Sequence, residues 1–288
     1  MDESLIASYI ASFGRDGFVH VKNLVPADEI AGFAYAVDEA VAARKVNDVR
    51  MLSEKSPYEQ SFIQCQNLWE DWPSVRALTF HPAIAGMAAR LIGARRLRLW
   101  HDQALYKEPG GRETDAHQDH PYWPINEDRT LTAWIPLMDI TEELGCMGYV
   151  PGSHRGRRTF VNIFTEPGSG EKLLAQFAPA RACFVPCRAG DVLYHHGSTA
   201  HLAKANRSST MRRVHTAIYF GDGCTRSAVP KHHPSVDRAD IAIGDVIASG
   251  VTPVAYPLEG GLPTPVPWPD SERVRTLKTL GVIPSEVR

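Results

Sequence analysis

The sequence predicts a mainly β fold, in which a double-stranded β-helix (jelly-roll) barrel carries helices packed outside it. Residues 1–94 have helical patterning. From Arg95 onward the chain consists of short apolar runs rich in aromatic and β-branched residues, which are typical of strands. Glycine and proline, 22 and 21 of the 288 residues, divide these runs. Helices followed by many short strands with long connections favour a jelly roll.

The helical part contains two amphipathic segments. In residues 26–45 apolar side chains recur every three or four positions, which predicts a helix, and Pro26 suits its first turn. Residues 72–93 predict one or two further helices that end at Gly93. Between these segments, residues 60–68 alternate enough to form a strand.

Residues 95–225 form the predicted jelly-roll core. The expected strands lie in the segments RLRLWHDQALYKE, LTAWIPLMDI, RACFVPC, DVLYHH and RRVHTAIYF. Residues 226–288 form a proline-rich tail, which we expect to fold back over the barrel because Tyr256, Leu262 and Trp268 favour burial. We find no repeat and no boundary signal, so the whole chain is expected to form a single domain.

The composition excludes several classes of protein. Hydrophobic residues make up 43% and charged residues 22%, as in ordinary globular chains. Lys and Arg number 31 against 33 Asp and Glu, so no basic excess favours nucleic acid or an anionic membrane. No apolar run approaches the roughly 20 residues of a membrane span. The acidic start and the five cysteines, which form no CxxC motif, predict a cytoplasmic protein with reduced thiols.

Histidines concentrate in the β half of the chain and supply a candidate metal site. Side chains two apart on a strand share a face, so His117 and Asp119 can point at one metal ion. A third ligand is available downstream from His195, His196 or His201. Two imidazoles and one carboxylate form the facial triad of non-haem Fe(II) oxygenases, which leaves positions open for a chelating co-substrate and O2.

Three separated blocks of the sequence match a known family in order. They are LYKEPGG…HQDHPYWP in residues 105–124, GCMGYVPGSHRG in residues 145–156 and GDVLYHHGSTAHLAKANRSSTMRR in residues 190–213. By these motifs the sequence resembles the phytanoyl-CoA dioxygenase family of Fe(II)/2-oxoglutarate-dependent oxygenases, over about residues 10–225. The resemblance implies the jelly-roll fold, Fe(II) as the metal, 2-oxoglutarate and O2 as co-substrates, and ascorbate as an additional reductant.

The resemblance also implies which downstream histidine is the metal ligand. Members of the family carry an Asn five residues after the distal ligand, a Ser or Thr about seven after it and an Arg eleven after it. Counted from His201, these positions hold Asn206, Ser208 and Arg212. Counted from His196, only the Arg position matches.

The implied iron ligands are therefore His117, Asp119 and His201. His195 and His196 are expected to end the preceding strand and to bond the backbone or line the site. Halogenases of this chemistry replace the carboxylate ligand by a small residue. Because Asp119 is present, the resemblance implies hydroxylation or another oxidation instead of halogenation.

Arg212 has a chemical reason to lie near the iron. When 2-oxoglutarate chelates a metal through its 1-carboxylate and 2-keto oxygens, its C5 carboxylate needs a partner, and a guanidinium can bind it bidentately. Arg213 is expected to face the other way on the strand. Family position further implies co-substrate contacts at Thr114, Trp134 and Gln103, and core packing is the alternative for the last two.

The residues around the HxD motif are candidates for a substrate pocket. Tyr122 and Trp123 follow the motif directly and are either core aromatics or the apolar wall of the pocket, and Gln118 lies between the two ligands. The pair His232 and His233 has no carboxylate at ligand spacing, so we predict a solvated loop there instead of a second metal site.

The sequence thus predicts an Fe(II)/2-oxoglutarate-dependent dioxygenase of secondary metabolism. It would hydroxylate an unactivated C–H bond of a small, largely apolar metabolite while 2-oxoglutarate and O2 become succinate and CO2. The family spans fatty acyl thioesters, compatible solutes, antibiotics and terpenoids, so the substrate stays open, as do desaturation and cyclisation. The alternative is a zinc-dependent jelly-roll hydrolase or isomerase, which would have no need of Arg212.

Overall fold

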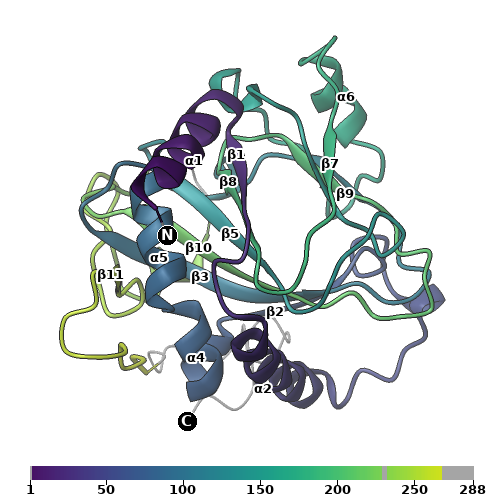
Figure 1. Ribbon diagram of the computed structural model, residues 1–288, viewed down its shortest axis with the longest axis horizontal. Helices are drawn as coiled ribbons and strands as arrows, with labels where there is room; N and C mark the ends of the chain where they lie inside the picture. The colour runs from purple at the N-terminus through teal and green to yellow at the C-terminus, as the bar shows by residue number, and fades with distance from the viewer. Residues whose placement is uncertain (1, 229–231, 268–288) are drawn as a thin grey trace.

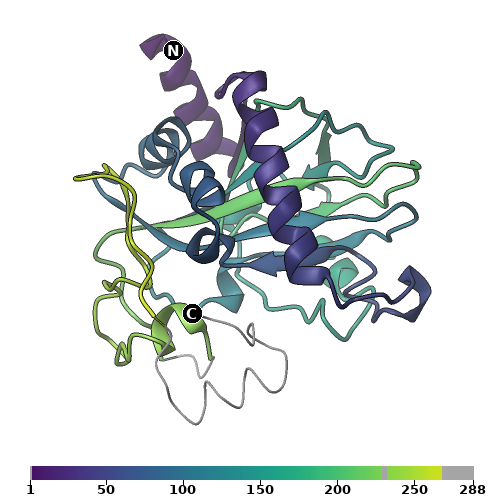
Figure 2. The same cartoon turned by 90° about the horizontal axis from the view of Figure 1, so that it is seen from below.

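Two antiparallel sheets form the centre of the fold, and helices lie along the outer side of the larger one (Figures 1 and 2). The computed structural model describes residues 2–228 and 232–267. The larger sheet has the order β1-β8-β5-β10-β3-β11, with β2 also paired to β3, and the smaller one has the order β4-β9-β6-β7. The predicted class, mainly β with flanking helices in the jelly-roll manner, is confirmed.

The strands are short and their bounds follow the apolar runs of the sequence. They are β1 (Phe18–Val21), β2 (Ile63–Gln66), β3 (Leu97–Tyr106), β4 (Thr114–His117), β5 (Thr130–Pro136), β6 (Met147–Tyr149), β7 (Cys183–Val185), β8 (Val192–His196), β9 (His201–Ala203), β10 (Val214–Gly221) and β11 (Val254–Tyr256). The predicted strand near residue 64 is confirmed as β2.

The longer helices come from the first part of the chain, as predicted. They are α1 (Glu3–Asp16), α2 (Ala27–Lys45), α4 (Pro73–Thr79) and α5 (Pro82–Leu91), and the shorter ones are α3 (Leu68–Asp71), α6 (Gly170–Ala175) and α7 (Pro234–Asp237). Single 3-10 turns occur at η1 (Leu52–Glu54), η2 (His120–Tyr122) and η3 (Ser153–Arg155). None of the helices described here combines the length and apolar character that crossing a membrane requires.

The helices begin and end near the proline and glycine residues that predicted their ends, and the start of α2 differs by one residue. Pro26 is the N-cap of α2 and lies one position before its first turn. Pro82 starts α5, and because a residue before proline is driven to extended backbone, the predicted helix over 72–93 is split into α4 and α5. Gly93 follows α5 with φ +63°, a left-handed conformation that glycine adopts without strain.

Strand β5 shows how the core divides. All of its residues are buried, because both of its faces are covered. Leu131, Ala133 and Ile135 belong to the main apolar cluster, which they share with α2, α4 and α5. Trp134 points the other way and joins the cluster between the two sheets. The core therefore lies mainly between sheet and helices, and the inner face of the sheet is available for a cavity.

The tail after residue 226 folds back in part. Strand β11 pairs with β3 through Val254 opposite Arg98 and Tyr256 opposite Leu97, which confirms that this stretch packs on the sheet. Leu262 is 45% exposed, so the expectation that it is buried was wrong. Trp268 lies outside the described residues.

A β-bulge in β3 decides which of its side chains face inward. Ile218 of β10 is opposite His101, while the next residue, Tyr219, is opposite Leu99, so Trp100 is the extra residue. Leu99 packs in the helix-side cluster, whereas His101 lines the space between the sheets. Without the extra residue, period-2 alternation would place His101 on the helix side.

The next residue, Asp102, is fully buried on the helix side of the sheet. One of its carboxyl oxygens accepts hydrogen bonds from the Trp69 N–H at 2.9 Å and from the Thr79 hydroxyl at 2.8 Å. Burial raises the pKa of Asp102 to about 7 and outweighs these hydrogen bonds. The carboxyl is thus protonated in the fold at a pH where it is ionised in the unfolded chain.

We predict that Asp102→Asn changes the pH dependence of stability. Because the folded pKa lies above the unfolded one, the carboxyl contributes stability below pH 4, and this is lost as the pH rises from about 4 to 7. The loss amounts to at most about 4 kcal/mol, and a neutral amide does not incur it. Denaturant unfolding at a series of pH values gives the free energy of unfolding of both proteins. Relative to wild type, that of the variant should increase as the pH rises over this range. If the free energies of unfolding of variant and wild type differed by the same amount at every pH, Asp102 would be ionised in the folded protein as it is in the unfolded chain.

Candidate metal centre

The smaller sheet brings two distant histidines together. Strands β4 and β9 are antiparallel, and His117 at the end of β4 lies directly opposite His201 at the start of β9. Their ring centroids are 4.2 Å apart. Directly opposed residues of an antiparallel pair carry their side chains on the same face. The strand register alone therefore sets the two imidazoles side by side.

Asp119 joins the histidines by a different route from the one predicted. It does not continue the strand but has φ −72° and ψ −46°, a helical conformation, at the start of η2. The two side chains do lie close together, but the expectation that they share a face of one strand was wrong. A turn immediately after the strand brings the carboxylate back toward the imidazoles.

The three side chains could hold one metal ion. An oxygen of Asp119 lies 3.6 Å from Nε2 of His117 and 3.7 Å from Nε2 of His201. All three potential ligand atoms lie within 4.8 Å of one another. Two imidazole nitrogens and one carboxylate oxygen form the donor set that suits non-haem iron.

Backbone carbonyls orient both imidazoles for metal binding. Nδ1 of His117 is 2.9 Å from the carbonyl oxygen of Asp115, and Nδ1 of His201 is 2.9 Å from that of Thr199. A carbonyl oxygen can only accept, so each Nδ1 carries the proton and each Nε2 has its lone pair free. This arrangement is the usual outer support of metal-binding histidines.

Two residues that the sequence did not single out as supports hold the carboxylate. The Thr132 hydroxyl donates to one oxygen of Asp119 at 2.9 Å, and Nε2 of His195 lies 3.2 Å from the same oxygen. The other oxygen is the one that faces the two histidines. Thr132 and His195 lie opposite each other on β5 and β8, a proximity that needs the sheet register to be known.

Burial places the three candidate ligands in the protonation states that a metal needs. Burial lowers the pKa of His117 and of His201 to about 4, helped by the neighbouring imidazoles. Burial by itself would raise the pKa of Asp119, but His201 and His195 more than offset it and the pKa is lowered. At neutral pH the site therefore presents two neutral imidazoles and one carboxylate.

Two residues near the motif have structural partners instead. His196 has both ring nitrogens engaged, Nε2 with the Asp128 carbonyl at 2.8 Å and Nδ1 with the Ser198 N–H at 3.1 Å. Gln118 is fully buried, donates to the Ser198 carbonyl and accepts from the Thr159 N–H. It does not line the cavity, so its assignment to the substrate pocket was wrong: its side-chain amide bonds the backbone of Ser198 and Thr159 instead.

Arg212 is a buried cation without a carboxylate partner in the described part of the chain. It is 1% exposed, its Nη1 donates to the Gly145 carbonyl at 2.8 Å, and its Nε has no partner. The guanidinium lies 5.6 Å from the ring centroid of Trp134. Burial lowers its pKa to about 10, so it stays charged at neutral pH. A buried charge of this kind is costly unless an anion binds to it.

The other residues implied as co-substrate contacts surround the same space. Thr114, Gln103 and Trp134 all line the cavity that contains the candidate ligands and Arg212. The buried Lys107, which the sequence did not single out, donates to the Thr114 hydroxyl oxygen at 3.3 Å. The Lys107 side chain also donates to the Arg112 carbonyl, and burial lowers its pKa well below the usual value. Gln103 accepts from the side-chain amide of Gln64 at 2.6 Å.

The cavity has a volume of about 460 Å³ and opens between the two sheets. Its floor is the inner face of the larger sheet, which contributes Gln64, Gln66, His101, Gln103, Thr132, Trp134 and Thr216. Tyr122 and Trp123 line it as well, and both also pack in a buried apolar cluster with Trp100 and Phe220. Apart from Asp119 and Arg212, no Asp, Glu, Lys or Arg of the described residues lines it.

Aromatic rings surround the mouth of this cavity. The ring of Tyr58 lies 5.1 Å from that of Phe62 and 4.6 Å from that of Phe164. Tyr122 in turn lies 5.0 Å from Phe160 and 5.7 Å from Phe164. Phe160 and Phe164 are 50% and 43% exposed, so the ring of aromatics extends to the surface. We call these five residues the aromatic mouth.

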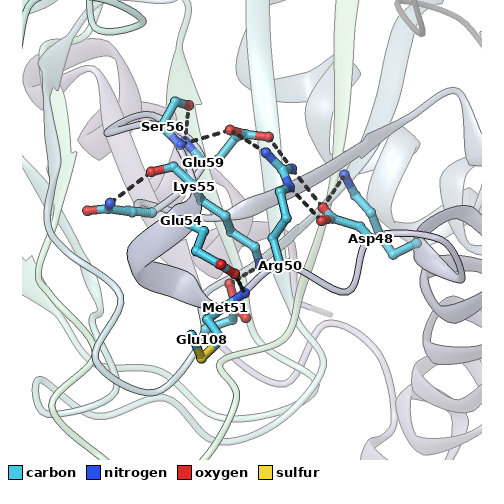
Figure 3. A network of polar contacts seen from close by, with 10 residues as sticks. Asp48, Arg50, Met51, Glu54, Lys55, Ser56, Glu59 and Glu108 are labelled. Carbon is cyan, nitrogen blue, oxygen red and sulfur yellow. Dashed lines mark hydrogen bonds and ion pairs between the residues drawn. The ribbon is translucent and has the colours of Figure 1, made fainter.

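The loop between α2 and β2, which supplies two of the five rings, is held by ion pairs (Figure 3). Arg50 donates to Asp48 at 2.7 Å and to Glu59 at 2.6 Å, and its guanidinium lowers the pKa of both carboxyls to about 2. Lys55 is buried and pairs with Glu108, directly after β3, at 2.6 Å. These contacts fix the loop against the barrel and position its aromatic side chains.

His233 corrects the expectation of a solvated loop. Its ring stacks on Trp100 at a centroid distance of 4.4 Å and lies 5.6 Å from the ring of His101. Both His232 and His233 line the cavity. The sequence could not reveal this position, because the contact depends on α7 packing against the bulged strand.

These features define a class of protein. A jelly-roll core holds a candidate centre of two histidines and one carboxylate in the same cavity as a buried arginine that has no counter-ion among the described residues. That combination suits a metal-dependent oxygenase with an anionic co-substrate.

The family model of phytanoyl-CoA dioxygenase (PhyH) matches residues 13–214, and the chain belongs to this family. It is accordingly an Fe(II)/2-oxoglutarate-dependent dioxygenase, with iron, 2-oxoglutarate and O2 as cofactor and co-substrates. This confirms the resemblance noted in the sequence and decides against the zinc hydrolase or isomerase.

Curated relatives support this membership. The mouse protein named phytanoyl-CoA dioxygenase domain-containing protein 1 is 30% identical, over 74% of this chain and 89% of the relative. A protein of Stutzerimonas stutzeri, named a probable alpha-ketoglutarate-dependent hypophosphite dioxygenase, is 23% identical over 68% of this chain and 72% of its own length.

Solved structures agree in fold. The non-haem alpha-ketoglutarate-dependent carbocyclase SnoK from nogalamycin biosynthesis has a TM-score of 0.71 at 30% identity, covering 86% of this chain and 95% of SnoK. The epimerase SnoN, solved with Fe3+, alpha-ketoglutarate and nogalamycin RO, has a TM-score of 0.68 at 27% identity, covering 88% of this chain and all of SnoN.

We predict that His201→Ala and His196→Ala separate the two downstream histidines. His201→Ala should weaken metal binding by more than about 100-fold, because loss of an outer support alone costs 10- to 100-fold. His196→Ala should bind metal like wild type, since both of its nitrogens bond the backbone. Anaerobic titration with Co(II), followed by absorption, measures both affinities. Loss of binding in His196→Ala with retention in His201→Ala would contradict the assignment.

Proposed function

We propose that His117, Asp119 and His201 bind Fe(II), that Arg212 binds the C5 carboxylate of 2-oxoglutarate, and that the enzyme hydroxylates an unactivated C–H bond of a small, largely apolar metabolite. The observation that carries the proposal is the buried, uncompensated guanidinium of Arg212 in the same cavity as the three candidate ligands. A dicarboxylate that chelates a metal at one end needs such a cation at the other.

The role of the chain in this reaction follows from its contacts. Bound iron supplies the activation of O2 and the oxidising power, which amino-acid side chains lack. The carbonyls behind His117 and His201 keep each Nε2 unprotonated for the metal. Thr132 and His195 keep one oxygen of Asp119 occupied, so the other is directed at the metal.

We propose that Arg212, Thr114, Trp134 and Gln103 together bind the co-substrate. Arg212 supplies the charge, and Thr114, whose oxygen accepts from Lys107, supplies a hydroxyl donor. The Trp134 ring lies against the guanidinium and limits its rotation. Gln103 contributes an amide on the adjacent strand, where it lies opposite Thr216.

The character of the cavity supports a small and uncharged substrate. The only Asp, Glu, Lys or Arg side chains of the described residues that line it, Asp119 and Arg212, are assigned above to the metal and the co-substrate. Aromatic rings form its mouth, and a volume of about 460 Å³ is in the range of small-molecule sites. The free state of the five cysteines, four of them buried, supports a cytoplasmic location.

Ring closure or epimerisation in natural-product biosynthesis is the second candidate for the outcome. It is favoured by the likeness to a carbocyclase and an epimerase at 30% and 27% identity. The products differ in composition: hydroxylation adds one oxygen atom, ring closure removes two hydrogen atoms and epimerisation changes neither. Mass spectrometry of a converted substrate separates the three.

Succinate release tests the proposed function directly. The purified protein is supplied with Fe(II), 2-oxoglutarate, O2 and a panel of neutral lipophilic metabolites. We expect succinate formation to rise with some members of the panel, to need iron and to stop when Zn(II) replaces it. Activity on an ester or isomerisable substrate with zinc, and none with iron and 2-oxoglutarate, would overturn the proposal.

We predict that Arg212→Ala separates co-substrate binding from metal binding. Losing one partner of a buried charge pair costs about 3–5 kcal/mol, so the KM for 2-oxoglutarate should rise by roughly two to four decades while Co(II) affinity changes little. Arg212→Lys should recover only part of this, because an ammonium lacks the bidentate fork. KM is measured from initial rates of succinate release.

Arg213→Ala is the matched control for this prediction. Arg213 points away from the cavity and pairs with Asp38 of α2 at 2.5 Å. The variant should keep the wild-type KM for 2-oxoglutarate. A KM that rises in Arg213→Ala and not in Arg212→Ala would move the anion site one residue along the chain.

A further inference from the structure

Two stacked imidazoles form part of the cavity wall outside the candidate metal ligands. His101 comes from the bulge of β3, and His233 lies directly before α7. Their rings are 5.6 Å apart at an interplanar angle of 27°, and Trp100 packs on His233 at 4.4 Å. We call His101 and His233 the imidazole pair. The proposed binding of iron and 2-oxoglutarate assigns no role to either.

The hydrogen bonds of the imidazole pair fix opposite tautomers. Nδ1 of His101 lies 3.3 Å from the Asp102 carbonyl oxygen, which can only accept, so Nδ1 carries the proton and Nε2 is an acceptor. Nδ1 of His233 accepts from the Ser235 N–H at 3.2 Å, so its proton is on Nε2, which is a donor. Burial lowers the pKa of His101 to about 4 and that of His233 well below its usual value, so both rings are neutral.

Neither Nε2 atom has a hydrogen-bond partner among the described residues. Neither atom is fully buried, and both residues line the cavity, so a ligand or water can complete these bonds. The pair therefore offers the cavity one acceptor and one donor, both uncharged, in a wall that also contains aromatic, aliphatic, glutamine and threonine side chains.

The sheet register sets the distance from the imidazole pair to the metal. His101 lies opposite Ile218 of β10, and Ile218 lies opposite Thr132 of β5. Adjacent strands are about 4.8 Å apart, so His101 is about 10 Å from Thr132, the residue that holds Asp119. A molecule of two or three fused rings spans such a distance. A group bound at His101 would thus leave another carbon of the same molecule near the metal.

We propose that the imidazole pair recognises a hydroxyl group of a neutral substrate built on fused or aromatic rings. The hydroxyl would donate to Nε2 of His101 and accept from Nε2–H of His233, while the aromatic mouth packs against the ring faces. A carboxylate or phosphate in this position would face the lone pair of His101, and the one Lys or Arg of the described residues that lines the cavity, Arg212, is assigned above to the co-substrate. This inference rests on the proposed function and names the substrate class of the same cavity.

Three naphthalene probes test the inference on the protein loaded with Fe(II) and saturating 2-oxoglutarate, without O2. They are 2-naphthol, which has the hydroxyl donor, 2-methoxynaphthalene, which keeps only the acceptor, and 2-naphthoate, which is an anion. Equilibrium dialysis gives each Kd. One hydrogen bond should make 2-naphthol bind about two- to tenfold more tightly than 2-methoxynaphthalene, and 2-naphthoate should bind most weakly.

Variants assign the preference to the imidazole pair. His101→Leu should abolish the preference for 2-naphthol over 2-methoxynaphthalene, and His101→Gln, which keeps an acceptor, should retain part of it. His233→Phe keeps the stack on Trp100. It should weaken the binding of both 2-naphthol and 2-methoxynaphthalene without changing the ratio of their Kd values. His81→Leu is the matched control, because His81 lies outside the cavity and bonds Glu29. It should bind the probes like wild type.

Three results would overturn the inference: an unchanged preference in folded His101→Leu, tighter binding of 2-naphthoate than of 2-naphthol, or no binding of either neutral probe by wild type. Circular dichroism and thermal melting establish whether each variant is folded. If His101→Leu does not fold, the probe preference of His101→Gln tests the role of His101 instead. Succinate release by the wild-type preparation reports on the proposed function separately. A probe preference without succinate release would refute only that function, and succinate release without the preference would refute only this inference.

Discussion

The pairing of β4 with β9 is the constraint on which the candidate centre depends. It sets His117 opposite His201, residues that are far apart in the chain, and a slip of one residue would turn one imidazole to the other face of the sheet. The carbonyls that orient both rings belong to the same two strand ends, so they depend on this register as well. Asp119 then needs only a single turn after β4 to reach them.

Burial between the two sheets gives each polar group of the cavity a defined state. Low polarity keeps the histidines neutral, while Asp119 stays ionised because the neighbouring His201 and His195 lower its pKa. The same environment makes the unpaired charge of Arg212 costly, so it favours binding of an anion. The cavity thus combines the candidate metal ligands, one buried guanidinium and a remainder of aromatic, aliphatic and neutral polar side chains.

Several parts of the site could be predicted from the sequence and others could not. The HxD spacing and the position of Arg212 after His201 are local patterns, and the structure brings these residues into one cavity. Gln118 was assigned to the pocket wrongly, because its backbone partners, the Ser198 carbonyl and the Thr159 N–H, come from distant segments that the sequence does not place beside it. His233 was expected in solvent, because nothing in the neighbouring sequence shows that it stacks on Trp100.

The sequence by itself determined the class of fold, the helices over residues 27–45 and 73–91, the family and the identity of the candidate ligands. Each of these depends on residue type and short-range spacing, which periodicity and motifs preserve. Only the tertiary structure decided which side chains support Asp119, which way His101 faces and what surrounds the cavity. Those features depend on register and on the bulge in β3, where one inserted residue reverses the face of every side chain that follows.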